Sequence, residues 1–406
     1  MSRRARQVRG LALLVVLSGV IAVGLAILLG GGDKQPLALG GAGAPTTLQP
    51  SRPRGVVPPA RPAPGFTPPP AVVRMLAAMP LERQVAQLFM VGLQGSSSPG
   101  AVTLAGPGWG GFVFSQQNYV SDFAAGAYAA AASTADRLLR APAALVAATQ
   151  EGGPQTAIAD LPPEGQAVLG SSGQPDAARA QATLAAQRLL AMGFNTTLAP
   201  LADVDTAGGP LNGRLFSTSP GLVARFTAAA VGGYRAAGII SIVGHFPGTG
   251  AASADPDQMQ ATVGGSLPAL KSRDLLPFAA VAGAAPVIEM SNAVYAAFDG
   301  VTPAGLLPDA IDLLRRGYGF EGVVISDDLD AALQATGGTI GQAALAALQA
   351  GDDLLYITGT SDEQLAAYNA VLSAAQRNAG VRSRVRHAAE RVLALKLRYK
   401  LVSSSG

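Results

Sequence analysis

From about residue 72 to the C-terminus, short apolar runs alternate with longer segments of helical character. Eight runs have the length and the β-branched or apolar content of strands: QLFMVGL, GGFVFS, ALVAATQE, TLAPLADV, IISIVGHF, PVIEMSN, GVVISDD and DLLYITG. Between them, Ala- and Leu-rich stretches predict helices over residues 122–139, 177–192, 221–237, 308–316, 341–350 and 362–376. Strands that are apolar throughout and are each followed by a helix indicate parallel pairing. The pattern therefore predicts a single (β/α)8 barrel domain over residues 72–402.

An open, doubly wound sheet is the alternative fold for the same alternation. That fold needs a phosphate-binding turn between its first strand and the following helix. The string GPGWGG, residues 106–111, has the spacing G-x-G-x-x-G, but it precedes a strand instead of following one. We therefore interpret this string as a loop and favour the barrel.

The first 32 residues differ in character from the rest of the chain. Residues 1–10 contain Arg3, Arg4, Arg6 and Arg9, and residues 11–32 contain no charge. This apolar stretch is longer than the roughly 7–15 residues of a signal-peptide core and approaches the roughly 20 residues that span a bilayer. We expect an N-terminal membrane anchor with its arginines on the cytoplasmic side, so that the barrel is extracytoplasmic.

Cleavage of this segment, which would release a secreted protein, is the alternative, because the small residues of ALGGAGA follow it. The next segment, residues 33–71, is rich in Gly, Pro and Ala and is typical of an extended spacer.

Composition excludes several classes of site. The chain has no Cys and only two His, His245 and His387, which excludes disulfides, thiol nucleophiles and Cys/His zinc sites. We expect no cofactor and no metal. The first 75 residues hold nine Lys/Arg and one acidic residue, which leaves 20 basic and 25 acidic residues for the rest. A mildly acidic domain argues against binding of nucleic acid.

The chemistry of a (β/α)8 barrel takes place at the C-terminal ends of its strands, where the βα loops converge. Several polar side chains follow the predicted strands directly: Gln150, Glu151, Asp203, Asp205, His245, Asn292, Asp327 and Asp328. Carboxylates dominate this group. Such an enrichment suits the cleavage of glycosidic bonds, in which two carboxyl groups flank the scissile bond.

Eight strings follow one another along residues 76–401: GFVFSQQNY, TQEGG, GFNTTLAPLADVD, GRLFS, GHFPGTG, LLPF, LLRRGYGFEGVVISDDLD and ALQAGDDLLYI. Their order resembles glycoside hydrolase family 3, in its single-domain bacterial β-N-acetylhexosaminidase branch. The ordered set of strings is specific for this family, and GFEGVVISDDLD is the most specific of them. The resemblance implies a retaining glycosidase that acts on a carbohydrate substrate with β-linked amino sugars, such as those of cell walls.

The resemblance also assigns roles to individual residues. Asp327 would be the nucleophile, which agrees with a carboxylate held at the end of a buried strand. Arg214, in NGRLFS, and His245, in GHFPGTG, would bind the sugar. Asp203 would orient these groups without contacting the sugar itself. Each residue also has a structural alternative. Asp327 or Asp328 could cap the following helix, and we favour this role for Asp328. Arg214 could be a surface arginine, and His245 could be a buried structural histidine.

The sequence also departs from the family pattern. The family lysine before His245 is Gly244 here, and further polar positions are replaced by Thr149, Pro154, Ala157 and Thr249. The family's Asp-Ser-His acid/base string aligns with Asp255, Pro256 and Asp257.

We therefore expect Asp257 to act as the acid/base, provided that burial or Asp255 raises its pKa. The alternative is that Asp257 stays ionised in solvent, and that the protein is a weakened barrel that binds glycans without turning them over.

Overall fold

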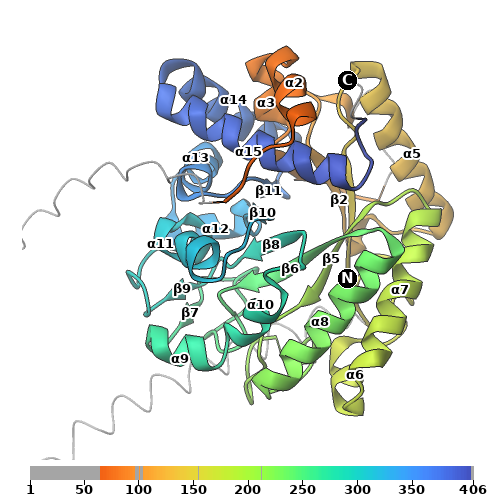
Figure 1. Cartoon of the computed structure of the whole chain (residues 1–406), viewed down its shortest axis with the longest axis vertical. Coiled ribbons are helices and arrows are strands. Elements are labelled where there is room, and N and C mark those ends of the chain that lie inside the picture. Colours follow the sequence, from red (N-terminus) through yellow and green to blue (C-terminus); the bar gives the residue numbers. More distant parts are fainter. Residues whose placement is uncertain (1–64, 97–99, 101–103, 154, 212, 404–406) are drawn as a thin grey trace, which may run out of the picture. The chain divides into compact units, whose positions relative to one another are not determined.

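The structure is a computed structural model that describes residues 65–96, 100, 104–153, 155–211 and 213–403. All eight predicted strands are present, and every neighbouring pair is parallel. The strands are β1 (Phe89–Gly92), β2 (Gly111–Phe114), β3 (Leu145–Gly152), β5 (Thr196–Leu201), β6 (Ile240–Phe246), β8 (Val287–Met290), β10 (Val323–Ile325) and β11 (Leu355–Ile357). They follow one another in chain order around the sheet, and a parallel bridge between Ile325 and Leu354 joins the last two. The predicted (β/α)8 barrel is confirmed (Figure 1).

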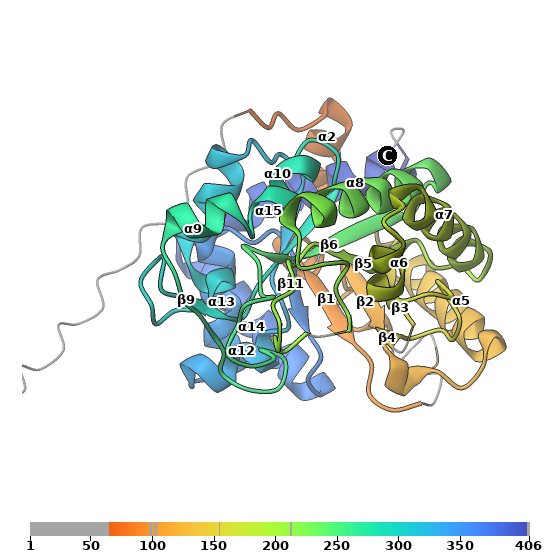
Figure 2. The same cartoon turned by 90° about the horizontal axis from the view of Figure 1, so that it is seen from below.

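Helices surround this barrel, as Figure 2 shows for α5, α7, α8 and α10. The helices of more than one turn are α2 (Pro70–Ala78), α3 (Leu81–Ala86), α5 (Asp122–Leu139), α6 (Gln166–Ser172), α7 (Pro175–Ala191), α8 (Pro220–Ala237), α9 (Leu267–Ser272), α10 (Leu276–Val281), α11 (Pro308–Asp312), α12 (Leu329–Thr336), α13 (Ile340–Ala350), α14 (Ser361–Arg377) and α15 (Ala379–Arg398). Short 3₁₀ turns lie at Gln116–Asn118 and Ala304–Leu306. Five of the six helices that the sequence predicts begin and end within two residues of these bounds, and the exception is the helix predicted over residues 308–316.

The predicted helix over 308–316 divides into α11 and a π-helical turn at Leu313–Gly317. Arg315 lies in this turn and donates hydrogen bonds to the carbonyl oxygens of Phe320 and Gly322. The π-helical turn, which is wider than an α-helical turn, thus lies where the buried guanidinium of Arg315 reaches the start of β10.

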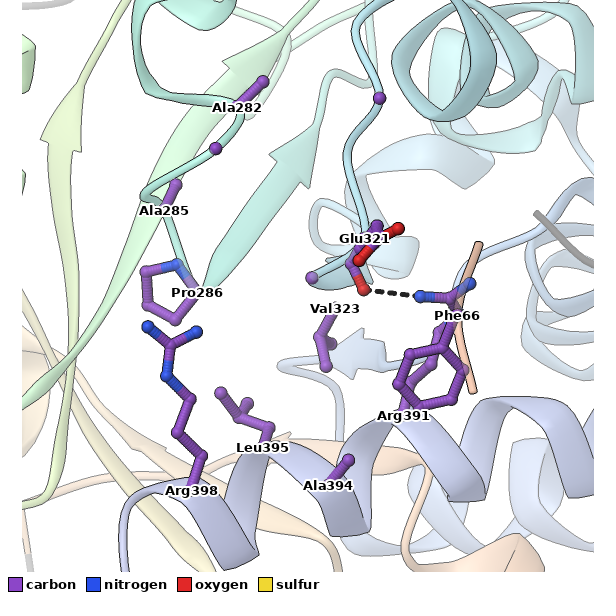
Figure 3. Close-up of a pocket in the computed structure, with 13 residues that line it drawn as sticks. Phe66, Ala282, Ala285, Pro286, Glu321, Val323, Arg391, Ala394, Leu395 and Arg398 are labelled. Atoms are coloured by element: carbon purple, nitrogen blue, oxygen red, sulfur yellow. Dashed lines mark hydrogen bonds between the residues drawn. The ribbon is translucent and has the colours of Figure 1, made fainter. Parts of the chain in front are cut away.

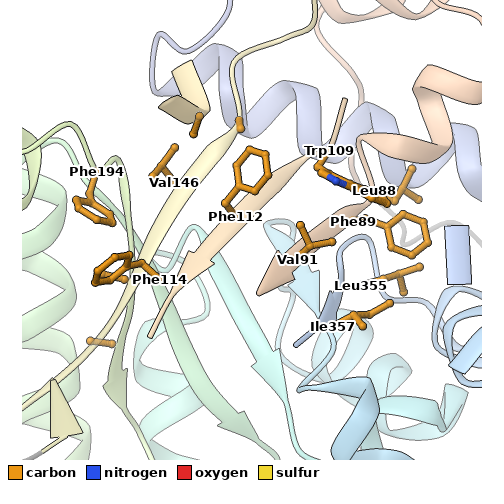
Figure 4. Packing of buried hydrophobic residues seen from close by; sticks show 14 of the residues in the cluster. Leu88, Phe89, Val91, Trp109, Phe112, Phe114, Val146, Phe194, Leu355 and Ile357 are labelled. Carbon is orange, nitrogen blue, oxygen red and sulfur yellow. The ribbon is translucent and has the colours of Figure 1, made fainter. Parts of the chain in front are cut away.

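Side chains alternate between the two faces of the barrel wall. Outward-facing residues pack against the helices in two clusters, and part of the larger one is drawn in Figure 4. Phe89, Phe112 and Trp109 belong to it, and the rings of Phe89 and Trp109 meet edge to face with centroids 5.9 Å apart. Inward-facing residues form a separate cluster inside the barrel: Met90, Val113, Leu145, Ala147, Ile240, Ile242, Val287, Val323, Ile325, Leu354 and Tyr356.

Helix α15 lies across the N-terminal end of the barrel. Val392 and Leu395 join the inner cluster from this helix, so the barrel interior is packed at that end. A cavity of about 310 Å³ separates α15 from the strand starts at Pro286 and Val323 (Figure 3). Phe66 also lies there, with its ring centroid 4.2 Å from the guanidinium carbon of Arg391.

A second, two-stranded sheet was not predicted. The strands β7 (Thr262–Val263) and β9 (Val294–Tyr295) come from the loops after β6 and β8 and pair in parallel. They lie side by side at one edge of the molecule in Figure 1. The hydroxyl of Tyr295 donates to the carbonyl oxygen of Gly248, at 2.9 Å. The loop after β6 is therefore fixed at both of its ends.

The predicted basic N-terminus, the anchor over residues 11–32 and most of the spacer over residues 33–71 lie outside the described residues. Within the part of the chain that the structure describes, no helix is both long and apolar enough to cross a bilayer.

Candidate active site

A cavity of about 240 Å³ opens at the C-terminal ends of the strands, above the apolar interior of the barrel. Its walls continue the inward-facing positions of the strands: Thr149 and Glu151 lie on β3, and Thr358 follows β11 directly. The lining residues are Thr149, Glu151, Leu198, Leu201, Arg214, Ile242, His245, Asp257, Glu289, Asp327, Asp328, Tyr356 and Thr358. Four of the six predicted site residues, Arg214, His245, Asp257 and Asp327, therefore meet in one cavity.

Asp327 lies two residues beyond the end of β10 and is 4% exposed. The backbone N–H of Asn292 donates to its Oδ2 at 3.1 Å, and that of Asp328 donates to its Oδ1 at 2.8 Å. Burial raises the pKa of Asp327 well above its ordinary value, and Asp257 adds to the rise, whereas His245 and the Asp328 N–H oppose it. The carboxylate is thus held rigidly and faces the cavity.

Asp328 has the capping role that the sequence analysis favours. Its Oδ1 accepts the N–H groups of Asp330, at 3.2 Å, and Thr358, at 3.1 Å, and its carboxylate also accepts the Thr358 hydroxyl. It is the N-cap of α12. Asp327 is therefore free of the capping role.

Arg214 is already held by acidic neighbours. Its Nε and Nη2 donate to Glu151 at 2.9 and 2.7 Å, which is a bidentate pair. Its Nη1 lies 3.6 Å from Oδ2 of Asp255. The prediction gave Glu151 a place at the rim but no role, and the structure shows that it fixes the orientation of Arg214.

His245 lies on β6, where the pairing of this strand with both neighbours becomes irregular. Such irregularities re-aim side chains next to active sites. The Nδ1 of His245 lies 2.9 Å from Oδ2 of Asp203, which also accepts the His245 backbone N–H at 3.2 Å. Burial alone would lower the pKa of His245, but the charges of Asp203, Glu289 and Asp327 and the hydrogen bond to Asp203 raise it well above its ordinary value.

Asp203 is fully buried and lies behind His245. Its Oδ1 accepts the backbone N–H of Thr249 at 2.5 Å. One carboxylate therefore joins β5 to the loop after β6 and fixes the imidazole, which is the supporting position that the sequence predicts.

Asp257 reaches the cavity from the loop after β6. Its backbone N–H donates to Oδ1 of Asp255, at 3.1 Å, so the contact of Asp255 with Arg214 also positions Asp257. The residue is exposed, and it is one of the residues that line the cavity. Desolvation raises the pKa of Asp257, and the charge of Asp255 adds to the rise, whereas His245 and Arg214 lower it.

The sequence analysis missed Glu289. This residue is an inward-facing position of β8 and is 5% exposed. Burial raises the pKa of Glu289 to about 7, and Asp257 and Glu151 contribute to the rise, although His245 opposes it. The signal that could have found Glu289 is the alternation of the strand, because a carboxylate stands among apolar residues in PVIEMSN at a position that faces the barrel interior.

Three further rim residues are structural. Gln150 is fully buried and bonds the backbone of Ile158 and Leu161. Asp205 accepts the N–H of Thr206, at 2.8 Å, outside the cavity lining. Asn292 donates from Nδ2 to the carbonyl oxygen of Asp328, at 2.7 Å.

His387 lies on α15, away from the rim, as the sequence indicated. Within the described residues, no group of three or more His, Asp or Glu side chains is arranged to hold a metal ion.

Two curated relatives illustrate what this chain is similar to. It is 34% identical to a β-hexosaminidase of Stenotrophomonas maltophilia over 223 residues, which cover 52% of this chain and 66% of that protein. It is 32% identical to a β-hexosaminidase of Alkalilimnicola ehrlichii over 284 residues, which cover 66% of this chain and 80% of that protein. The chain thus spans somewhat less than two thirds of the first relative's length.

Solved structures agree in fold. A glycoside hydrolase family 3 β-N-acetylglucosaminidase from Paenibacillus sp. superposes with a TM-score of 0.74 at 28% identity, covering 80% of this chain and 63% of that one. A β-N-acetylhexosaminidase from Beutenbergia cavernae superposes with a TM-score of 0.71 at 29% identity, covering 79% and 99%. The family model for the glycosyl hydrolase family 3 N-terminal domain matches residues 80–395. This chain therefore belongs to glycosyl hydrolase family 3.

Proposed function

We propose that this chain is a retaining glycoside hydrolase of the β-N-acetylhexosaminidase type, which cleaves β-linked amino sugars such as those of cell walls. One observation carries the proposal. Asp327 projects from the end of β10 into a cavity that a second carboxyl group, Asp257, enters from the loop after β6. A retaining glycosidase needs such a pair, with one group as nucleophile and the other as acid and then base.

The reaction takes two steps in this site. In the first, an oxygen of Asp327 attacks the anomeric carbon C1, the bond from C1 to the leaving-group oxygen breaks, and Asp257 gives its proton to that oxygen. In the second, Asp257 takes a proton from water, the water oxygen attacks C1, and the bond to Asp327 breaks. His245 and the Asp328 N–H oppose the rise that burial causes in the pKa of Asp327, whereas desolvation of Asp257 in the cavity favours a retained proton.

His245 and Arg214 bind the sugar in this proposal. The bond to Asp203 fixes the imidazole ring and leaves Nε2 for the cavity. Glu151 fixes Arg214 through Nε and Nη2, and Asp255 lies 3.6 Å from Nη1, so the guanidinium is held in place at the wall of the cavity, where sugar hydroxyls can reach it. Both side chains are thus oriented before a ligand arrives, which reduces the cost of ordering them on binding.

The size of the cavity suits one sugar residue. Its volume of about 240 Å³ lies below the roughly 300–1,000 Å³ of sites for drug-sized ligands. We infer that the enzyme removes single residues from the non-reducing end of a chain.

The test is turnover by the full chain of an aryl β-N-acetylglucosaminide and an aryl β-glucoside. We expect release of the aryl group from the amino sugar, and loss of that release in Asp327→Asn. An activated leaving group needs little help from an acid, so this assay tests Asp327 almost independently of Asp257. Binding of sugars without turnover of either substrate would instead indicate a weakened barrel that only binds glycans.

We also propose that residues 11–32 anchor the protein to a membrane, with the barrel on its outer side. The basic residues 1–10 and the uncharged stretch that follows them support this proposal. The test compares membrane fractionation of the full chain with that of a variant in which four of the apolar residues of this segment are replaced by Asp. Recovery of the unaltered chain in the soluble fraction would contradict anchoring and favour cleavage or another location.

A further inference from the structure

Glu289 has no part in the proposed reaction, yet it lines the same cavity. It is in register with Ile325 on the neighbouring strand β10, and Asp327 lies two residues further towards the rim. Because alternate residues of a strand point to the same face, Glu289 lies one layer deeper than the nucleophile. Leu198 and Ile242, which also line the cavity, pack in the apolar cluster inside the barrel. Glu289 therefore places a carboxyl group at the floor of the cavity.

The Glu289 carboxyl group has free hydrogen-bonding capacity. None of the described residues donates a hydrogen bond to it, although the residue is only 5% exposed. Asp327, by contrast, accepts two backbone N–H groups. A buried carboxyl group without a donor is costly, and a ligand hydroxyl that enters the cavity supplies the missing donor.

Gly244, on the adjacent strand β6, leaves the space that this carboxyl group uses. A Cβ atom at position 244 would lie 3.0 Å from Oε2 of Glu289, which is closer than ordinary contacts allow. A side chain there, such as the lysine of the family pattern, would press on the carboxyl group. The glycine on β6 and the glutamate on β8 thus together put a hydrogen-bond acceptor near the place where the family pattern has a cationic donor.

The cavity also determines which end of a sugar meets Glu289. Its volume of about 240 Å³ suits one sugar residue, so the leaving group extends through the opening at the rim. The anomeric carbon C1, which carries the leaving group, lies at the level of Asp327. C4 is opposite C1 in a pyranose ring, so the C4 end of the sugar points to the floor. The acetamido group on C2 is next to C1 and stays at the level of the nucleophile, away from Glu289.

We propose that Glu289 is a specificity-determining residue whose carboxyl group accepts a hydrogen bond from the C4 hydroxyl of the sugar. The inference rests on the proposed function and adds the requirement that this hydroxyl is free. A residue in the interior of a 4-linked chain has this oxygen in a glycosidic bond, so it has no proton to donate, and the next sugar would meet the floor. Glu289 thus restricts cleavage to the non-reducing end.

The contact discriminates because Glu289 has no other partner. If a sugar without the C4 hydroxyl fills the cavity, the carboxyl group faces neither water nor a donor, and a buried polar group left unpaired is costly. Arg214 and His245 differ in this respect, because Glu151 and Asp203 pair with them before any ligand binds. Loss of a sugar hydroxyl from either of these two side chains leaves it with a partner.

The test compares kcat/KM of the full chain for an aryl β-N-acetylglucosaminide with that for its 4-deoxy and 6-deoxy analogues. We expect the 4-deoxy sugar to lose about 10- to 100-fold, and the 6-deoxy sugar to lose less.

Three variants then test the origin of the 4-deoxy penalty. Glu289→Ala removes the acceptor and should reduce this penalty to less than about threefold. Glu289→Gln keeps an acceptor oxygen without the charge and should give an intermediate penalty. Glu390→Gln, at a buried glutamate of α15 outside the cavity, is the matched control and should leave the penalty unchanged.

A merely structural role of Glu289 would lower kcat/KM for all three substrates alike and leave the 4-deoxy penalty as it is in the wild type. That outcome would overturn the inference, as would a 6-deoxy penalty that disappears in Glu289→Ala in place of the 4-deoxy penalty. Turnover of the parent glycoside that depends on Asp327 would in either case leave the proposed function standing. If the parent glycoside is not turned over, the proposed function fails.

Calorimetry of the wild-type chain tests the contact without turnover and without a folded variant. We expect N-acetyl-D-glucosamine to bind more tightly than its 4-deoxy analogue, and equal affinities would refute the contact.

Discussion

Buried acidic residues at the two ends of the barrel have opposite surroundings in the case of Asp353 at one end and of Asp327 and Glu289 at the other. At the N-terminal end, Asp353 accepts Arg315 at 2.5 Å and Arg384 at 2.9 Å, and the N–H of Val324 at 3.1 Å. Burial alone would raise the pKa of Asp353, but the two arginines lower it below its ordinary value. At the C-terminal end, burial and neighbouring carboxylates raise the pKa of Asp327 and Glu289, and no arginine is paired with either.

We interpret the paired charges at the N-terminal end as stabilising the fold, and the carboxyl groups of Asp327 and Glu289 at the C-terminal end as serving function. Paired charges at the N-terminal end fix the position of α15 and the π-helical turn against the strand starts. Asp352 is an exception there, because its carboxylate has no hydrogen-bond partner among the described residues and burial raises its pKa. Unpaired carboxyl groups at the other end cost stability, and proteins retain such costs at sites where a substrate supplies what is missing.

Asp327→Asn should give the largest functional effect. Loss of the nucleophile removes the covalent route, so we expect kcat/KM for an aryl glycoside to fall by at least about 10⁴-fold. The melting temperature at neutral pH should change little, because the substitution removes a carboxyl group whose burial is costly but also gives up one of its two backbone N–H bonds. Asp299→Asn, on an exposed loop, is the control for both measurements. A large loss of stability would show that Asp327 holds the fold in the way that Asp353 does.

Asp353→Ala should give the largest effect on stability. It leaves Arg315 and Arg384 buried without their carboxylate, which typically costs about 3–5 kcal/mol. Denaturant titration of both variants measures this cost. Asp312→Ala, which removes an exposed partner of Arg316 at 3.4 Å, should cost less than about 1 kcal/mol. Equal losses in the two variants would mean that burial does not distinguish these ion pairs.

Asp257→Asn tests whether the loop after β6 supplies the acid. We expect kcat/KM for a natural disaccharide to fall by about 10²–10⁴-fold, and the fall for an activated aryl glycoside to be much smaller. The pH profile should also lose its alkaline limb, because that limb reports deprotonation of the acid. Equal losses on the two substrates would assign Asp257 to binding instead.

Glu289→Gln should stabilise the folded chain at neutral and higher pH. The pKa of Glu289 is about 7 in the folded chain and near 4.5 in its ordinary state, so the folded chain gives up this proton less readily than the unfolded chain. The group therefore costs stability above pH 7, on the order of 3 kcal/mol. The gain from the substitution should shrink as the pH falls from about 7 towards 4.5, and vanish below that. Denaturant midpoints at several pH values measure this gain, and a gain that does not depend on pH would contradict the titration of Glu289.

The sequence predicted the barrel because its elements are locally consistent. The strands are mostly apolar, several helices are preceded by Ser, Thr, Asp or Pro and followed by Gly, and polar residues follow the strands directly, so the rim of the barrel could be predicted without knowledge of the contacts. Asp327 and His245 were found in this way, whereas Arg214 and Asp257 came only from the resemblance to the family. The role of Asp328 was also predictable, because an Asp directly before a helix commonly caps it.

Pairing across the barrel was not predictable. Glu151 meets Arg214 through a separation of 63 residues, and the sheet of β7 and β9 joins two loops whose short strands carry no pattern of their own. Glu289 was missed because the run around it was treated as a uniformly apolar strand. The alternation of residues in PVIEMSN was the signal that could have found it.

The most direct test of Asp327 as nucleophile is to trap the covalent intermediate. A 5-fluoro glycosyl fluoride of the preferred amino sugar slows both steps and lets the glycosyl-enzyme accumulate, after which digestion and mass spectrometry locate the label. We expect one sugar per chain, attached to Asp327. A label on another residue, or an unlabelled protein that releases its product with inverted anomeric configuration, would contradict this role.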